Sequence, residues 1–252
     1  MRTPLPLLLF LLLPLFAAAQ GLAGERNADR GLLIEISYGP VSPAGELADR
    51  YGRGFALGGG IDYLLKGKNL QIGAMGMFGF GNIVKEDVLA GLRGTAGFVI
   101  SNQRSPADIQ LRQRHLFLAP RLGYTFPLGE KNRRAGIKVS TAVGYLAHWI
   151  RIQQDAVQEV IQVEGDRRAG YDRLTGGPAV YQFVGYQQLA LNRRLNFYLG
   201  ADLLAGFTKP LRAFDVPSAA PSDQSGRTDL ILGLRAGFIL PLYFGEGREI
   251  FY

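Results

Sequence analysis

The chain has 252 residues, of which 47% are hydrophobic and 19% are charged, and this balance excludes an intrinsically disordered protein. It contains no cysteine, which excludes disulfide scaffolds, thiolate metal sites and cysteine nucleophiles. The formal net charge of +7 is spread along the chain without a run of five basic residues, so nothing indicates a nucleic-acid partner.

The first nineteen residues have the pattern of a secretory signal peptide. Arg2 supplies a positive charge, residues 5–16 form an apolar stretch, and residues 17–19 are three alanines that suit a cleavage site. A membrane-spanning helix needs about 20 apolar residues, and this stretch is shorter. We therefore expect a signal peptide over residues 1–19 and a mature chain that forms a single domain over residues 20–252.

The rest of the sequence alternates between apolar residues and small or polar ones. In chain order the predicted strands are 31–41, 53–64, 69–81, 114–126, 137–149, 179–190, 195–208 and 230–242. Strands of ten or more residues are longer than the usual length of about five or six and match the roughly 9 to 11 residues of a transmembrane strand. The pattern predicts an all-β fold, a transmembrane antiparallel up-and-down β-barrel of about eight strands.

The links between these strands alternate in length. The long links are 42–52, 82–113, 152–177 and 209–226, and the short ones are 65–68, 127–136 and 191–194. Outer-membrane barrels have long extracellular loops and short periplasmic turns, so we expect the long links outside the cell. A soluble barrel of lipocalin type would also have eight strands, but its apolar face would point inward. Here the larger apolar residues share one face and glycine and charge share the other, which favours the membrane barrel.

Charged residues fall on the face opposite the apolar one, where they would point into the lumen. Three are acids and three are bases: Glu35, Asp62, Arg121, Lys138, Asp202 and Arg235. An unpaired buried ion costs several kcal/mol, so we expect these acids and bases to pair. The pairing predicts a salt-bridged plug that fills the lumen, and the alternative is a gated ion path or a small ligand site.

Catalysis and metal binding have little support in the sequence. The two histidines are His115 and His148, too few for a histidine metal cage without carboxylate help, and we expect no metal and no cofactor. A rim enzyme would use serine or aspartate with histidine. Ser140 lies eight residues before His148, more than about 20 Å along a strand, and Asp155 could reach it only if its loop folds back. We assign no catalytic residue and do not expect an enzyme.

Several segments resemble small outer-membrane β-barrel proteins of Bacteroidota, namely residues 170–175, 181–188, 193–200, 206–212 and 229–252. In such barrels the last strand carries an insertion signal, which is a polar residue, a glycine two positions on, and then apolar or aromatic residues at alternate positions. Arg235, Gly237, Leu240 and Leu242 match this spacing, although leucines stand where aromatic residues are usual. The resemblance implies a location in the cell outer membrane and recognition by the insertion machinery, and it implies no established activity.

These features together predict a structural, binding or accessory subunit of an outer-membrane complex, with secretion and barrel assembly suggested by analogy only. The expected partners are outer-membrane lipid and lipopolysaccharide, the insertion machinery and a larger outer-membrane protein complex, and nucleic acid is not expected. The alternative is a narrow pore for ions or small solutes. A rim enzyme that acts on lipid or peptide is the least favoured reading.

Overall fold

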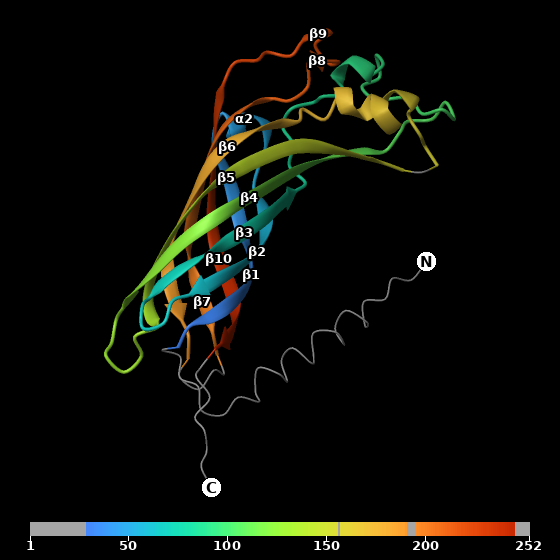
Figure 1. Cartoon of the computed structure of the whole chain (residues 1–252). Helices are drawn as coiled ribbons and strands as arrows, with labels where there is room; N and C mark the ends of the chain where they lie inside the picture. Colours follow the sequence, from blue (N-terminus) through green and yellow to red (C-terminus); the bar gives the residue numbers. More distant parts are fainter. Residues whose placement is uncertain (1–28, 156, 191–194, 245–252) are drawn as a thin grey trace.

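The computed structural model describes residues 29–155, 157–190 and 195–244. The predicted signal peptide, the short link at 191–194 and the end of the chain after residue 244 lie outside these residues. Eight antiparallel strands form a closed barrel in the order β1-β10-β7-β6-β5-β4-β3-β2 (Figure 1). Their bounds are β1 Gly31–Gly45, β2 Gly54–Leu64, β3 Leu70–Gly81, β4 Ile109–Pro127, β5 Ala135–Gln154, β6 Thr175–Gln188, β7 Phe197–Pro210 and β10 Arg227–Tyr243. The predicted eight-stranded up-and-down barrel is confirmed.

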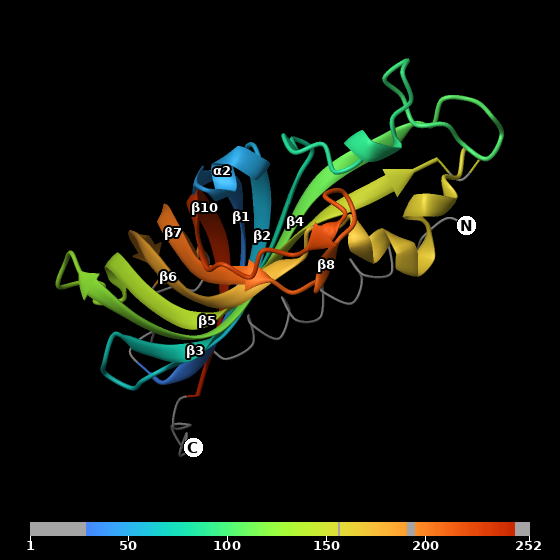
Figure 2. The same cartoon turned by 90° about the horizontal axis from the view of Figure 1, so that it is seen from above.

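The remaining elements are short and lie in the long links at one end of the barrel (Figures 1 and 2). They are α2 Leu47–Arg50, η1 Ala90–Leu92, η2 Ile161–Val163, η3 Gly165–Gly170, β8 Phe214–Asp215 and β9 Ala220–Pro221. No helix in the described ranges is both long and apolar enough to cross a lipid bilayer. Seen from above, the ends of β4 and β5 and the helices beside them reach out past the barrel wall (Figure 2).

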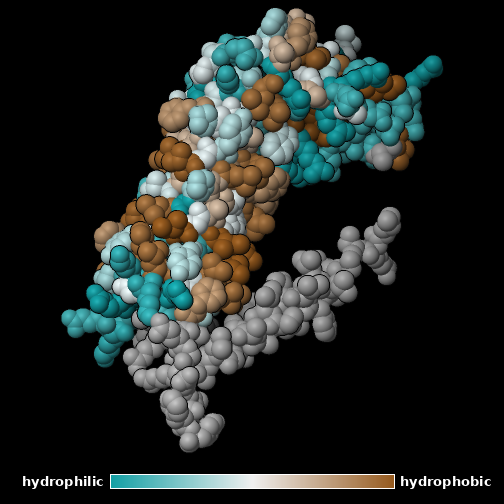
Figure 3. Space-filling view, in the orientation of Figure 1, coloured by the Kyte–Doolittle hydropathy of each residue, from teal (hydrophilic) through white to brown (hydrophobic). Residues whose placement is uncertain are grey.

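The outer wall of the barrel carries an apolar belt (Figure 3). On β4 the outward side chains from Leu116 to Phe126 include Leu118 and Leu122, which are 57% and 52% exposed. Ten residue steps cover about 33 Å along a strand. A strand tilt of about 40° reduces this to about 25 Å of height, which matches the apolar band of transmembrane barrels. Exposed leucines in such a belt require lipid around them.

Aromatic side chains mark both edges of the belt. At the end with the long links, Tyr38 stacks on Phe55 with ring centroids 5.4 Å apart, and Phe80 lies 6.5 Å from Tyr38. At the opposite end, Tyr124 and Phe126 meet edge to face at 4.8 Å. Tyrosine and other aromatic residues favour the boundary between lipid and water, so these pairs bound the membrane-embedded height.

The predicted boundaries of the long links are wrong at the extracellular end, because several strands continue above the belt. β4 begins at Ile109 and β5 runs to Gln154, where their ladder still pairs Ile109 with Gln154. The links expected at 42–52, 82–113, 152–177 and 209–226 are therefore 46–53, 82–108, 155–174 and 211–226. Above the bilayer the outward residues are polar, as at Gln110 and Arg151, so the apolar alternation stops while the backbone ladder goes on.

Candidate functional site

The charged residues predicted to face the lumen all lie inside the barrel, and four of them form one ion-paired group. Arg121 Nη2 lies 2.8 Å from Glu35 Oε2, and Arg121 Nε donates a hydrogen bond to Asp62 Oδ1 at 3.1 Å. Lys138 Nζ donates to Glu35 Oε1 at 2.6 Å and lies 5.0 Å from the centroid of the Tyr198 ring. Each of the four charged side chains is at most 6% exposed. Strands β1, β2, β4 and β5 thus meet through charges in the lumen.

The other two charges form a second group on the opposite wall. Arg235 of β10 pairs with Asp202 of β7, and the Tyr181 hydroxyl of β6 donates to Asp202 Oδ2 at 3.0 Å. Between the two groups a cavity of about 10 Å³ is lined by Arg121, Lys138 and Arg235. A cavity of this size holds about one water molecule. Ion-paired side chains therefore fill the lumen at this level.

A buried histidine occupies the lumen nearer the extracellular end. His148 Nε2 lies 2.8 Å from Asp229 Oδ2, and the Tyr51 hydroxyl lies 3.5 Å from His148 Nδ1. The Thr208 hydroxyl also donates to Asp229, so these contacts hold the buried imidazole and its carboxylate in place. Asp229 was missed from the sequence because it precedes the predicted strand 230–242.

His115 and Ser140 are also buried in the barrel wall, on β4 and β5. Among the described residues, the side-chain hydrogen-bond partners of His148 are Tyr51 and Asp229, and Ser140 is not one of them. Within the part of the chain that the structure covers, no group of three or more histidine, aspartate or glutamate side chains is arranged to hold a metal ion.

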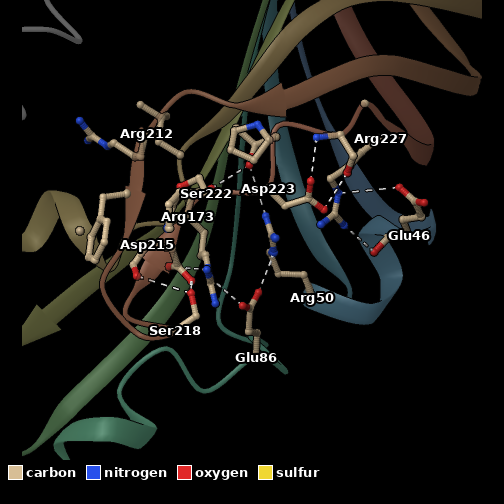
Figure 4. A pocket seen from close by; sticks show the side chains of 18 of the residues that line it. Glu46, Arg50, Glu86, Arg173, Arg212, Asp215, Ser218, Ser222, Asp223 and Arg227 are labelled. Carbon is tan, nitrogen blue, oxygen red and sulfur yellow. Dashed lines mark hydrogen bonds and ion pairs between the residues drawn. The ribbon is translucent and has the colours of Figure 1, made fainter.

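The extracellular end of the barrel opens into a pocket of about 770 Å³ (Figure 4). Glu86 from the link 82–108 lines this pocket and contacts two arginines: Arg50 Nε is 2.7 Å from Glu86 Oε2, and Arg173 Nε is 2.7 Å from Glu86 Oε1. Arg173 also pairs with Asp215 of β8. One glutamate and two arginines therefore tie together α2, the links 82–108 and 155–174, and the β8–β9 hairpin. We call this pocket the mouth pocket.

The rim of the mouth pocket is also charged. Arg212 Nη2 lies 2.5 Å from Asp172 Oδ2, and Arg227 Nε lies 3.8 Å from Glu46 Oε2. Burial raises the pKa of the Asp215 carboxyl, but the hydrogen bonds from Ser218 and Arg173 and the positive charge of Arg173 together outweigh burial and hold that pKa below its ordinary value. The volume lies in the range of ligand-binding pockets, and the lining carries charges of both signs. Asp172, Arg173 and Arg212 fall in the resembling segments 170–175 and 206–212, but nothing in the sequence indicates that they share a pocket.

The residues predicted as an insertion signal lie on the strand that closes the barrel against β1. Arg235 and Gly237 face the lumen, whereas Leu240 and Leu242 are half-buried on the outer face. Leu240 pairs with Ile34 and Leu242 pairs with Leu32, at the end that holds the short turns. Their role in membrane insertion stays a prediction.

No protein-family model matches the chain, and no curated protein matches it. Among solved structures, the chain is similar to the N-terminal β-barrel domain of OprF from Pseudomonas aeruginosa, with 14% identity, a TM-score of 0.34, and coverage of 83% of this chain and 96% of that one. It is also similar to the outer-membrane protein Ail of Yersinia pestis, with 12% identity, a TM-score of 0.30, and coverage of 83% and 98%.

The closed strand order and the apolar exterior define the fold by themselves. A closed antiparallel barrel with a lipid-facing apolar belt, a polar lumen, short turns at one end and long loops at the other has the architecture of an outer-membrane β-barrel. Both described chain ends, at Asp29 and Phe244, lie at the end with the short turns, and the mouth pocket lies at the extracellular end (Figure 1).

Proposed function

We propose that this outer-membrane β-barrel is a non-conducting binding protein that serves as an accessory subunit of a larger outer-membrane complex. The observation that carries the proposal is the contrast between the two ends of its interior. The lumen is filled by ion-paired side chains around a cavity of about 10 Å³, whereas the mouth pocket above it is open and has about 770 Å³. A filled barrel supports binding at its mouth better than passage through it.

The lining of the mouth pocket favours a charged polypeptide segment of a partner protein as its occupant. Arg50, Arg173 and Glu86 are held in place by their mutual ion pairs, so little side-chain freedom is lost when a partner binds. Arginine is enriched among the residues that contribute most to protein interfaces. The lining offers both guanidinium groups and carboxylates, and a polypeptide can supply the opposite charge to each.

The test is affinity purification of the tagged protein from native outer membranes in mild detergent, with stoichiometry measured by mass spectrometry. We expect a partner at near-equal copy number with the unaltered chain. The double variant R212E/D223K reverses two rim charges without changing the net charge, and it should lose that partner. Recovery of the barrel alone through several detergents would contradict the proposal.

The matched control is E130K/K131E, which reverses two exposed charges in the short link between β4 and β5 and also leaves the net charge unchanged. This variant should retain the partner, because the link lies at the opposite end of the barrel from the mouth pocket. Loss of the partner in both double variants would show that surface charge in general, and not the mouth pocket, holds the complex together.

A narrow pore for ions or small solutes is the second candidate, and the polar character of the lumen favours it. Planar-bilayer recordings separate the two functions. In a pore, Arg121→Gln or Arg235→Gln would change the single-channel conductance. In a plugged barrel the unaltered protein gives no steady channels, and both substitutions mainly lower the free energy of unfolding because each leaves a buried carboxylate without its cation.

A further inference from the structure

We propose that Arg112, Arg114 and Arg151, on the outer wall of the β4–β5 hairpin, bind the phosphate of an anionic lipid headgroup in the outer leaflet. We call these three residues the arginine cluster. It is separate from the lumen and from the mouth pocket, so the inference goes beyond the proposed function.

The ladder between β4 and β5 brings the three guanidinium groups together on one face. Arg112 pairs directly with Arg151, and Arg114 pairs with Trp149, one step nearer the belt on the same face. Side chains of residues that face each other across a ladder have β-carbons about 4.5–5.5 Å apart. The alternate residues on these strands, Gln113 and Ile150 among them, are buried on the inner side, so the arginine cluster points away from the barrel.

The arginine cluster has no acidic partner. The hydrogen bonds of Arg112 and Arg114 go to Gln110 Oε1 and to the Gln113 carbonyl oxygen, both at 2.6 Å. Across residues 29–155, 157–190 and 195–244, no carboxylate lies within ion-pair distance of these three side chains, and Arg112 Nε is buried without a hydrogen-bond partner. Like charges that face each other weaken a β ladder, so the chain carries a local cost that an anion would remove.

The height of the arginine cluster points to a lipid headgroup. Arg114 lies two residues above Leu116, which is about 7 Å along the strand, and Leu116 begins the apolar belt on β4. On β5, Tyr145 and Val143 continue the belt below Trp149. Tryptophan favours the boundary between lipid and water, so Trp149 places this level at the membrane surface.

A single amphiphilic lipid can contact both the arginine cluster and the apolar belt below it. Guanidinium groups bind phosphate oxygens in bidentate fashion, and the exposed leucines directly below would contact the acyl chains of the same lipid. An acidic segment of a soluble protein would neutralise the charges but would leave the adjacent belt unused. The combination of an unneutralised cationic cluster and a continuous apolar wall therefore favours a phosphate-bearing lipid.

Trp149 is the only tryptophan of the chain, so its fluorescence reports on this site directly. The full-length protein in zwitterionic nanodiscs is titrated with bisphosphorylated lipid A, with dephosphorylated lipid A and with free inorganic phosphate. We expect a saturable change in Trp149 emission with the phosphorylated lipid only. The variant R112Q/R114Q/R151Q should bind that lipid at least tenfold more weakly.

The control variant K68Q/K131Q/R133Q removes the same number of exposed positive charges at the opposite end of the barrel and should bind like the unaltered chain. If the triple arginine variant does not fold, Arg151→Gln alone should weaken binding at least threefold. An equal response to dephosphorylated lipid A, or unchanged binding by the arginine variants, would overturn the proposal. A response to inorganic phosphate at comparable concentrations would also overturn it, because the site would then be a simple anion site.

Discussion

Inside the barrel, glycines stand next to large polar side chains. A β-carbon on Gly79 would overlap the imidazole ring of His115, and one on Gly233 would overlap the Asp202 carboxylate. A β-carbon on Gly60 would lie 2.8 Å from Arg121 Nη2. The glycines of the inner wall thus leave the space through which charged side chains cross the lumen and reach partners on other strands.

Glu35 is the residue on which the larger ion-paired group depends, since it contacts both Arg121 and Lys138. We expect Glu35→Gln to lower the free energy of unfolding by about 3–5 kcal/mol, because Lys138 is then a buried charge without its acid. The measurement is a denaturant titration of the protein folded in lipid bilayers. The double variant E35Q/K138M removes both charges and should recover part of this loss.

Glu46→Gln is the control for this prediction. The Glu46 side chain is 58% exposed and lies 3.8 Å from Arg227, so its loss should cost less than about 1 kcal/mol. Equal effects of Glu35→Gln and Glu46→Gln would mean that the lumen charges are solvated and not part of a plug.

At the scale of elements, the β4–β5 hairpin extends beyond the membrane as a regular ladder. We predict that the amides of residues 109–113 and 150–154 that donate across the ladder exchange with deuterium much more slowly than the amides of residues 94–105 in the link 82–108, where backbone hydrogen bonds close short turns. Hydrogen-exchange mass spectrometry of the folded protein measures this difference. Equal exchange rates in the two regions would mean that the links begin and end where the sequence pattern predicts, at 82–113 and 152–177.

The sequence predicts strands well where a bilayer imposes the pattern and poorly above it. Within the belt each outward residue meets lipid, so alternation reveals both the strand and the inward face of residues such as Lys138 and Asp202. Above the belt, Arg112 and Arg151 are outward but polar, so the apolar signal ends. The sequence also does not show which acid pairs with which base in the lumen, because the partner of Glu35 depends on how the strands are staggered around the barrel.

The mouth pocket was beyond the reach of the sequence for a related reason. Arg50, Glu86, Arg173 and Asp215 come from four separate links, and their meeting depends on the closure of the barrel beneath them. No spacing along the chain records that meeting. The length of the links and the resembling segment 170–175, which contains Arg173, mark the region but not the pocket.

The β8–β9 hairpin contains a carboxyl whose ion pair should make its position depend on pH. The folded pKa of Asp215 lies below its ordinary value of 3.8. Its contacts with Arg173 and Ser218 therefore stabilise the hairpin above that ordinary value, and this stabilisation is lost as the pH falls through the lower folded pKa. We expect the hairpin to be held over the mouth pocket at neutral pH and to loosen below about pH 4.

The chain has no cysteine, so Ser222→Cys gives a unique attachment point for a fluorophore beside this hairpin. Fluorescence anisotropy should be high and constant near neutral pH and should fall in acid. Adding Asp215→Asn should lower the anisotropy at neutral pH and remove most of the dependence on pH. An Asp215→Asn variant that still loosens in acid would assign the transition to another group.

For the whole molecule, the contrast between an apolar outer wall and a charged interior determines that the barrel lies in a bilayer. A soluble barrel with this many exposed leucines would associate through them, whereas a bilayer about 25 Å high in its apolar part covers them. The same arrangement explains why lumen charges are paired and outer-wall charges appear only above the belt. The bilayer thus determines where each kind of residue is tolerated.

Two leucines of similar exposure test this contrast. Leu122 is 52% exposed in the middle of the belt on β4, and Leu128 is 67% exposed just past the end of that strand. In phosphatidylcholine bilayers we expect Leu122→Arg to lower the free energy of unfolding by about 2–4 kcal/mol and Leu128→Arg by no more than about 1 kcal/mol. Guanidinium titrations of the two variants measure the difference. Equal effects would mean that the belt does not face hydrocarbon, since an arginine on a water-exposed wall costs the same at either position.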